Sequence, residues 1–252
     1  MRLRPSSYFD RCSMNTRPAC NIPEMGPDAY ARWRASDIGA ITERLESRLI
    51  LDLAGDVSDR KVLDVGCGDG RLALELAKRG AVVTSIDGST AMINAAIARA
   101  EQHNANIEFQ VAVAEHLPFS AEQFDVVTAV TILCFVDDAG PVFREIARVL
   151  KPGGRFVIGE LGKWSTWAAA RRVRSWLGSR LWRLGRFRTA GELRTLAERA
   201  GLRVRGVRGA IFYPRCRIAA RVMAAADSVL GRLTTIGAAF IALNAIKPDG
   251  DA

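Results

Sequence analysis

The 252-residue sequence has few cysteines, only two histidines and no long apolar run without charge. Its five cysteines include no C-x-x-C pair, which argues against a disulfide framework and a zinc site and in favour of the reducing cytoplasm. No metal is therefore expected. No stretch reaches the roughly 18 consecutive apolar residues that a membrane-spanning helix needs. The histidines, His103 and His116, are interpreted as an exposed and a structural residue, respectively.

Acidic residues are scarce in two parts of the chain. Residues 1–26 are rich in arginine and have few apolar anchors, which predicts a disordered tail, although the composition also resembles a transit peptide. Met1 and Met14 are both candidate starts. Residues 163–221 hold 16 basic and two acidic residues, whereas the rest of the chain has 20 basic and 25 acidic residues. The net charge of +9 therefore originates in one region.

From Lys61 onward, apolar runs of strand length alternate with amphipathic helical runs, a pattern typical of a parallel sheet with helices on both faces. We predict an α/β fold with a Rossmann-like, doubly wound, seven-stranded and mostly parallel sheet. The length suits a single domain over 27–252. Its expected parts are N-terminal helices (27–56), a core (61–161), a helical insert (163–188) and a C-terminal part of the sheet (189–246). The expected strands are 61–65, 81–86, 107–113, 124–131, 155–161, 202–213 and 236–246.

The first strand leads into a loop with glycine at every second position. Residues 62–70 read V-L-D-V-G-C-G-D-G, with Gly66, Gly68 and Gly70 in the loop. Glycine adopts positive φ without steric cost and has no Cβ, so such a loop lets the backbone approach a nucleotide-like ligand. Arg71 occupies the position of the third glycine of a dinucleotide motif, and no lysine follows Gly70 as a P-loop requires.

The second strand ends in Asp87 and Gly88, 17 residues after Gly70. Ligands of open parallel sheets bind outside the carboxyl ends of the strands, where the strand order reverses. A carboxylate there can accept hydrogen bonds from both hydroxyls of a ribose. Taken alone, Asp87 would be interpreted as a solvated turn residue, but after G-x-G-x-G the ribose interpretation is preferred.

Four motifs in this order resemble those of class I S-adenosylmethionine-dependent methyltransferases, in the broad group that includes the ubiquinone and menaquinone methyltransferases. They are the glycine loop, A-E-H-L-P-F at 114–119, F-D-V-V at 124–127 and R-V-L-K-P-G-G-R at 148–155. The resemblance covers about residues 62–161. It implies S-adenosyl-L-methionine as the cofactor, residues 61–161 as the cofactor-binding core, and methyl transfer as the activity.

The resemblance also implies a cofactor site, position by position. Asp64 would lie near the methionine amino group, Asp87 at the ribose, and Gly88 close to the adenine. The other implied positions are Gly66, Cys67, Gly68 and Gly70 under the cofactor, Ala114 and Glu115 at the adenine edge, and Val130 where the sulfonium sits. The chain departs from the pattern at Val113, where many relatives carry an aspartate that accepts from the adenine amino group. The loss of that hydrogen bond costs about 1 kcal/mol.

The acceptor side is less defined, and the sequence names no catalytic residue. Cys134 and Phe135 stand where relatives often carry two histidines, so no obvious base is present. Tyr30 and Trp33, on the leading helix, are candidates to close over the acceptor or, alternatively, to pack on the sheet. Trp164, at the start of the insert, is a further candidate. Methyl transfer mainly requires aligned reactants and exclusion of water, so a missing base does not argue against an enzyme.

The insert combines four tryptophans with six arginines over residues 164–187. Its apolar positions Val173, Trp176, Leu177, Leu181 and Leu184 form one helical stripe. This is typical of a helix that lies on an anionic membrane surface. Packing of the stripe on the sheet, with solvated arginines, is the alternative. Nucleic-acid binding is not favoured because no recognition module accompanies the arginines.

We therefore expect an S-adenosylmethionine-dependent methyltransferase with a small, lipophilic or membrane-associated acceptor, in the cytoplasm or peripheral to the membrane. A catalytically degenerate cofactor-binding module that serves a partner is the alternative, since Val113 and the missing histidines depart from the pattern. A nucleic-acid methyltransferase ranks lower. The acceptor atom and the oligomeric state are not defined by the sequence.

Overall fold

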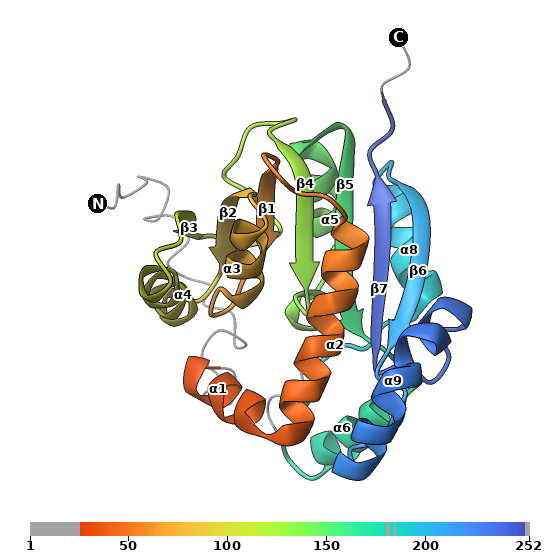
Figure 1. Cartoon of the computed structure of the whole chain (residues 1–252). Coiled ribbons are helices and arrows are strands. Elements are labelled where there is room, and N and C mark those ends of the chain that lie inside the picture. Colours follow the sequence, from red (N-terminus) through yellow and green to blue (C-terminus); the bar gives the residue numbers. More distant parts are fainter. Residues whose placement is uncertain (1–25, 180–181, 184, 250–252) are drawn as a thin grey trace.

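The computed structural model describes residues 26–179, 182–183 and 185–249. The predicted tail lies outside these residues except for Gly26, as do Leu181 and Leu184. The described chain forms a seven-stranded sheet in the order β3-β2-β1-β4-β5-β7-β6 (Figure 1). The strands are β1 (Lys61–Val65), β2 (Val82–Asp87), β3 (Ile107–Val111), β4 (Phe124–Val130), β5 (Leu150–Leu161), β6 (Arg203–Ala210) and β7 (Phe240–Ile246).

The sheet reverses its strand order beside β1. This strand pairs in parallel with both β2 and β4, so the chain runs out to the β3 edge and returns to the other side of β1. The strand β7 is antiparallel to its neighbours β5 and β6. The predicted doubly wound, mostly parallel sheet is confirmed, and its crevice lies at the carboxyl ends of β1 and β4.

Helices cover both faces of the sheet, as expected for apolar strands in a parallel arrangement. One face carries buried side chains of α2, α3 and α9, and the opposite face carries those of α5 and α8. Figure 1 shows α1, the first turns of α2, and α6 at the end of the sheet toward which the β4 arrow points. The helices are α1 (Pro27–Ala35), α2 (Asp37–Ala54), α3 (Arg71–Lys78), α4 (Thr90–Gln102), α5 (Ala139–Val149), α6 (Thr166–Trp176), α8 (Ala190–Arg199) and α9 (Arg217–Leu233).

Side-chain caps define several helix starts. The Ser89 hydroxyl accepts a hydrogen bond from the backbone N–H of Met92 at the start of α4, as the sequence predicted. Asp138 caps α5 in the same way by accepting from Gly140 N–H. Because these helices follow β2 and β4, the loops that precede them lie at the carboxyl edge of the sheet.

Several strand boundaries differ from the prediction because pairing partners end or begin elsewhere. The strand β6 ends at Ala210, which pairs with Phe240, and not at Tyr213. The strand β5 starts at Leu150, which pairs with Phe124 before a register shift, and not at Arg155. The strand β3 ends at Val111, which pairs with Asp87, the last residue of β2. The strand β7 starts at Phe240, opposite the ends of β5 and β6, and not at Ile236. The sequence of one strand does not reveal where the strand that pairs with it begins or ends.

The insert is anchored at one tryptophan and exposed at its far end. The Trp167 side chain is buried, and its Nε1 donates to the Tyr213 carbonyl at 2.8 Å. Trp176 and Leu177 are 84% and 81% exposed, and Val173 is also exposed. The packing of this part of the stripe on the sheet is therefore excluded. Among the described helices, none has both the length and the apolar character needed to cross a bilayer.

Candidate cofactor and acceptor site

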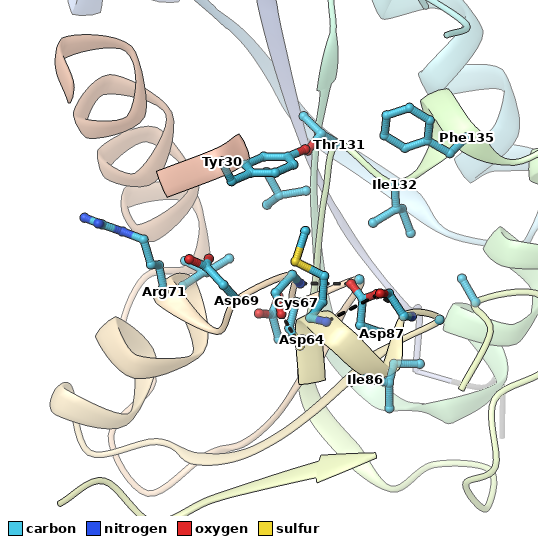
Figure 2. A pocket seen from close by; sticks show the side chains of 18 of the residues that line it. Tyr30, Asp64, Cys67, Asp69, Arg71, Ile86, Asp87, Thr131, Ile132 and Phe135 are labelled. Atoms are coloured by element: carbon cyan, nitrogen blue, oxygen red, sulfur yellow. Dashed lines mark hydrogen bonds between the residues drawn. The ribbon is translucent and has the colours of Figure 1, made fainter. Parts of the chain in front are cut away.

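A cavity of about 470 Å³ opens at the carboxyl ends of β1, β2 and β4. Figure 2 shows Tyr30 and Phe135 on one side of it and Asp64, Cys67 and Asp87 on the other. The helices α1 and α2 cover it. The predicted cofactor positions that line it are Asp64, Gly66, Cys67 and Gly68 from the first strand end, Asp87 and Gly88 from the second, Ala114 and Glu115 after β3, and Val130 at the end of β4.

The three loop glycines have positive φ values but different neighbours. A Cβ added to Gly66, at φ +72°, would collide with the Ile132 side chain, and one added to Gly70, at φ +78°, would lie 2.8 Å from the Ala96 Cβ. A Cβ added to Gly68, at φ +54°, would meet nothing within 4 Å. Gly70 thus allows close packing on α4 and does not line the cavity, whereas Gly68 leaves its backbone open to a ligand.

Asp87 connects the end of β2 to the glycine loop and to α4. Its Oδ2 accepts from the backbone N–H of Gly68 at 2.9 Å, and its Oδ1 accepts from Ser89 N–H at 2.8 Å. Burial raises the pKa of the Asp87 carboxyl, and these two hydrogen bonds oppose the shift. Each oxygen keeps a further lone pair for a hydroxyl in the cavity.

Asp64 presents a buried oxygen without a partner. The Thr128 hydroxyl donates to its Oδ1 at 2.7 Å, while Oδ2 has no hydrogen-bond partner among the described residues. Burial raises the pKa of Asp64 to about 7. An unsatisfied carboxylate oxygen at a cavity wall is costly unless a donor or cation occupies the cavity.

A network of ion pairs ties α1 to the glycine loop. The Arg34 guanidinium forms a two-pronged pair with the Asp69 carboxylate, and Arg99 on α4 donates to the Asp69 carboxylate at 2.6 Å and to its carbonyl at 2.8 Å. Glu43 on α2 pairs with Arg71 at 2.8 Å. Because Arg34 and Asp69 are nearly buried, at 11% and 8% exposure, this network holds α1 over the cavity.

The acceptor-side candidates separate into two groups. Tyr30, Trp33 and Phe135 line the cavity. Cys134 does not, because its thiol points into the protein and donates to the Thr131 carbonyl at 3.1 Å; burial raises the pKa of this thiol. Trp164 also lies outside the cavity wall; the residue is 62% exposed, and Lys163 lies over its ring.

Three residues in or next to the site, Asp69, Glu160 and Glu46, were not predicted from the sequence. Asp69 lies within the glycine loop, so its proximity to a ligand was foreseeable, but its partners on α1 and α4 were not. Glu160 was also missed: its Oε1 accepts from Leu133 N–H at 2.7 Å and so orders the turn after β4. Glu46, on α2, lines the cavity without belonging to any motif.

The comparisons with known proteins agree with this geometry. Residues 63–158 match the family described as methyltransferase domain. The chain is 34% identical over 160 residues to ubiquinone biosynthesis O-methyltransferase from Coxiella burnetii, which covers 62% of this chain and 68% of that protein. This chain belongs to the class I S-adenosylmethionine-dependent methyltransferases. The protein of the same name from Aeromonas salmonicida is 32% identical over 171 residues, or 66% of this chain and 72% of that protein.

Solved structures show the same fold. A methyltransferase from Thermotoga maritima, described as a possible histamine N-methyltransferase, superposes with a TM-score of 0.67 at 23% identity over 87% of this chain and 95% of that one. Geranyl diphosphate C-methyltransferase from Streptomyces coelicolor gives 0.63 at 17% identity over 92% and 88%. Since these neighbours differ in their acceptors, the shared fold does not select one.

The residues present fit S-adenosylmethionine. The open face of Gly68, the lone pairs of Asp87 and the unpaired Asp64 oxygen match a backbone cradle, a ribose and an ammonium group, respectively. Val113 lines the cavity at the position where, by the resemblance, many relatives carry an aspartate, so this position offers no carboxylate to an adenine amino group. The described residues hold no group of three His, Cys, Asp or Glu side chains that could bind a metal ion.

Proposed function

We propose that this methyltransferase acts on a small, lipophilic acceptor that binds between Tyr30, Trp33 and Phe135. The observation that carries the proposal is the aromatic wall of the cavity on the side away from the glycine loop. Aromatic side chains favour an apolar or ring-containing ligand. The relatives named ubiquinone biosynthesis O-methyltransferase support the same acceptor class.

The loop residues would hold the cofactor. Asp87 is placed to accept from the ribose hydroxyls, Asp64 to accept from the ammonium group, and the Gly68 backbone to lie against the ligand. When bound, S-adenosylmethionine supplies a methyl group on a sulfonium, which already has a good leaving group. The protein therefore contributes alignment and a dry site more than covalent chemistry.

The helix α1 would exclude water from the reaction. Tyr30 and Trp33 line the cavity from this helix, and Arg34, one residue after Trp33, is fixed to Asp69 in the loop. The Arg34 guanidinium also lies 5.6 Å from the centre of the Tyr30 ring, a cation–π distance. One cluster thus orients the cover and the cofactor loop together.

We also propose that α6 rests on an anionic membrane surface. Its exposed Val173 and Trp176 and the following Leu177 lie beside Arg174, in a region with a net charge of +14 over 163–221. Exposed aromatic and aliphatic side chains with adjacent arginines match the lipid interface. A lipophilic acceptor dissolved in that membrane would enter near the carboxyl edge of the sheet, where α6 lies (Figure 1).

Two measurements test the proposed function. Isothermal titration with S-adenosylmethionine and with S-adenosylhomocysteine measures the cofactor site, and transfer of a labelled methyl group to a lipid extract measures turnover. We expect binding of both ligands and label in the lipid-soluble fraction. Binding without transfer to any acceptor would favour a degenerate module that serves a partner, whereas transfer only to nucleic acid would overturn the small-molecule acceptor.

A further inference from the structure

On the inner face of α2, the Glu46 carboxylate lies between two buried side chains, Thr42 and Ile50. Thr42 is buried, and its hydroxyl shares a hydrogen bond of 3.0 Å with the Tyr213 hydroxyl. Ile50 is buried against β5, where its Cδ1 would lie 2.8 Å from a Cβ added to Gly159. Glu46 lies between them on the same face, four residues after Thr42 and four before Ile50. It lines the cavity.

Glu46 has no hydrogen bond and no ion pair within the part of the chain that the structure describes. The neighbouring carboxylate, Glu43, shows the contrast, since it is paired with Arg34 and Arg71. A carboxylate at a cavity wall with no protein partner is available to a ligand. It lines the same cavity as Tyr30, and its charge acts on the Tyr30 hydroxyl, on the acceptor side.

Four charged or titratable groups surround Glu46. Arg171 on α6 favours its charged form, and Glu43 on its own helix disfavours it. Tyr30 on α1 and Tyr213 after β6 are influenced by Glu46 in turn. Burial is the largest effect and raises the pKa of Glu46 to about 8. A carboxylate that titrates near neutral pH is suited to take up a proton.

Arg171 is fixed near Glu46 by aromatic rings and not by an ion pair. Its guanidinium carbon lies 4.7 Å from the centre of the Trp182 ring and 5.5 Å from that of Trp167. Its Nε and Nη1 are buried and have no hydrogen-bond partner among the described residues. Burial lowers the pKa of Arg171 to about 10, and Glu46 is the strongest opposing influence. The arginine therefore supplies a positive charge near Glu46 but forms no ion pair with it.

We propose that Glu46 is the general base of this methyltransferase and that the acceptor atom is the oxygen of a phenolic hydroxyl. This inference rests on the proposed function, since it requires an acceptor between Tyr30 and Phe135. The names of the O-methyltransferase relatives support oxygen over nitrogen or carbon. A phenol is protonated at neutral pH, because its pKa is about 10, so its methylation needs a base.

The hydroxyl proton passes to the Glu46 carboxylate, and the oxygen uses a lone pair to form the new bond to the methyl carbon. The carbon–sulfur bond breaks with its electron pair on sulfur, which leaves as a neutral thioether. The products are an aryl methyl ether, S-adenosylhomocysteine and protonated Glu46, which returns its proton to water.

The first test uses catechol as the acceptor probe and compares E46Q with D52N. Asp52 lies on the exposed face of the same helix, so D52N is matched in charge change and element. We expect E46Q to lower kcat by at least about 100-fold with S-adenosylhomocysteine affinity unchanged, and D52N to match the parent protein. An E46Q protein with kcat within twofold of the parent would overturn the proposal.

The second test measures the base directly. We expect kcat/KM to rise with pH in the parent protein, with a midpoint near pH 8 and a plateau above it, and this limb to be absent in E46Q. In R171Q, loss of the counter-charge should move the limb to higher pH. A ¹³C titration of labelled glutamate carboxyls, assigned by its absence in E46Q, reports the same group without an acceptor. A Glu46 signal that titrates at or below its ordinary value of 4.5 would also overturn the proposal.

Failure of this inference and failure of the proposed function give different results. If neither catechol nor any simple phenol is methylated while a lipid extract is, the proposed function stands and the phenolic acceptor is wrong. If cofactor binds but no extract is methylated, the proposed function itself fails.

Discussion

The carboxylate of Asp87 accepts a hydrogen bond from the backbone N–H of Gly68 at 2.9 Å. This bond joins the carboxyl end of β2 to the middle of the loop that follows β1. Its partner oxygen accepts from Ser89 N–H, so one side chain sets the relative position of the loop and α4. The two halves of the cofactor site are therefore ordered before any ligand arrives.

Replacement of Asp87 by alanine should weaken cofactor binding much more than it weakens the fold. The variant loses the ribose acceptor and the Gly68 contact, and hydrogen bonds to a charged group contribute about 1.5–3 kcal/mol each. We expect a roughly 10- to 100-fold increase in the dissociation constant of S-adenosylhomocysteine, measured by titration calorimetry, with a cooperative thermal transition retained. Unchanged affinity would show that Asp87 does not hold the ribose.

Replacement of Gly68 by alanine separates ligand contact from backbone strain. Gly68 and Gly201, at φ +54° and +79°, both have open space around an added Cβ, but only Gly68 lines the cavity. Both alanine variants should lose about 1 kcal/mol of unfolding free energy because of the positive φ. Only G68A should lose cofactor affinity. Equal affinities of the two variants would place the ligand elsewhere.

The parts of the site that the sequence predicted are those encoded by short segments. The glycine loop and the cap Ser89 follow a strand within a few residues, and Asp87 ends one, so spacing alone places them at one edge of the sheet. The packing of Gly70 against Ala96 on α4, away from the cavity lining, was not predicted, because it depends on how the helix packs.

Other parts depend on tertiary contacts that no local pattern contains. Arg34 and Asp69 are 35 residues apart in the chain. Glu46 becomes a cavity residue only because α2 crosses the sheet above β5. The sequence likewise showed an apolar stripe in the insert but not whether it was covered, since coverage is decided by the neighbours of α6.

Loss of the Asp69 carboxylate should release α1 from the cavity. In D69A the nearly buried Arg34 guanidinium loses its two-pronged partner and keeps only Glu43, at 3.6 Å, and the loss of a buried pair costs about 3 kcal/mol. We expect faster hydrogen exchange across residues 27–35 than in the parent protein. The control is E75A, which breaks an exposed pair with Lys78 and should change stability by less than about 0.5 kcal/mol. Unchanged exchange in α1 would contradict the anchoring role.

Asp64 should make stability depend on pH. Its pKa is about 7 in the folded protein against an ordinary value of 3.8, so between these values the folded state keeps a proton that the unfolded chain releases. The unfolding free energy should therefore fall as pH rises from about 4 to 7, and then level off. Urea titrations should show this decline in the parent protein and a weaker one in D64N. Parallel curves would show that Asp64 is charged when buried.

Exposed side chains of the insert should determine vesicle binding. The double variant W176S/L177S removes two apolar side chains that are more than 80% exposed, so the fold should keep its stability. Because burial of each side chain at a lipid interface contributes roughly 1 kcal/mol or more, vesicle affinity should fall at least about 10-fold. The control, V82S, removes another exposed apolar side chain, 60% exposed at the start of β2, away from the carboxyl edge. Flotation of the parent protein with phosphatidylglycerol vesicles but not with neutral vesicles is expected, and equal flotation of W176S/L177S and the parent would exclude this surface as the contact.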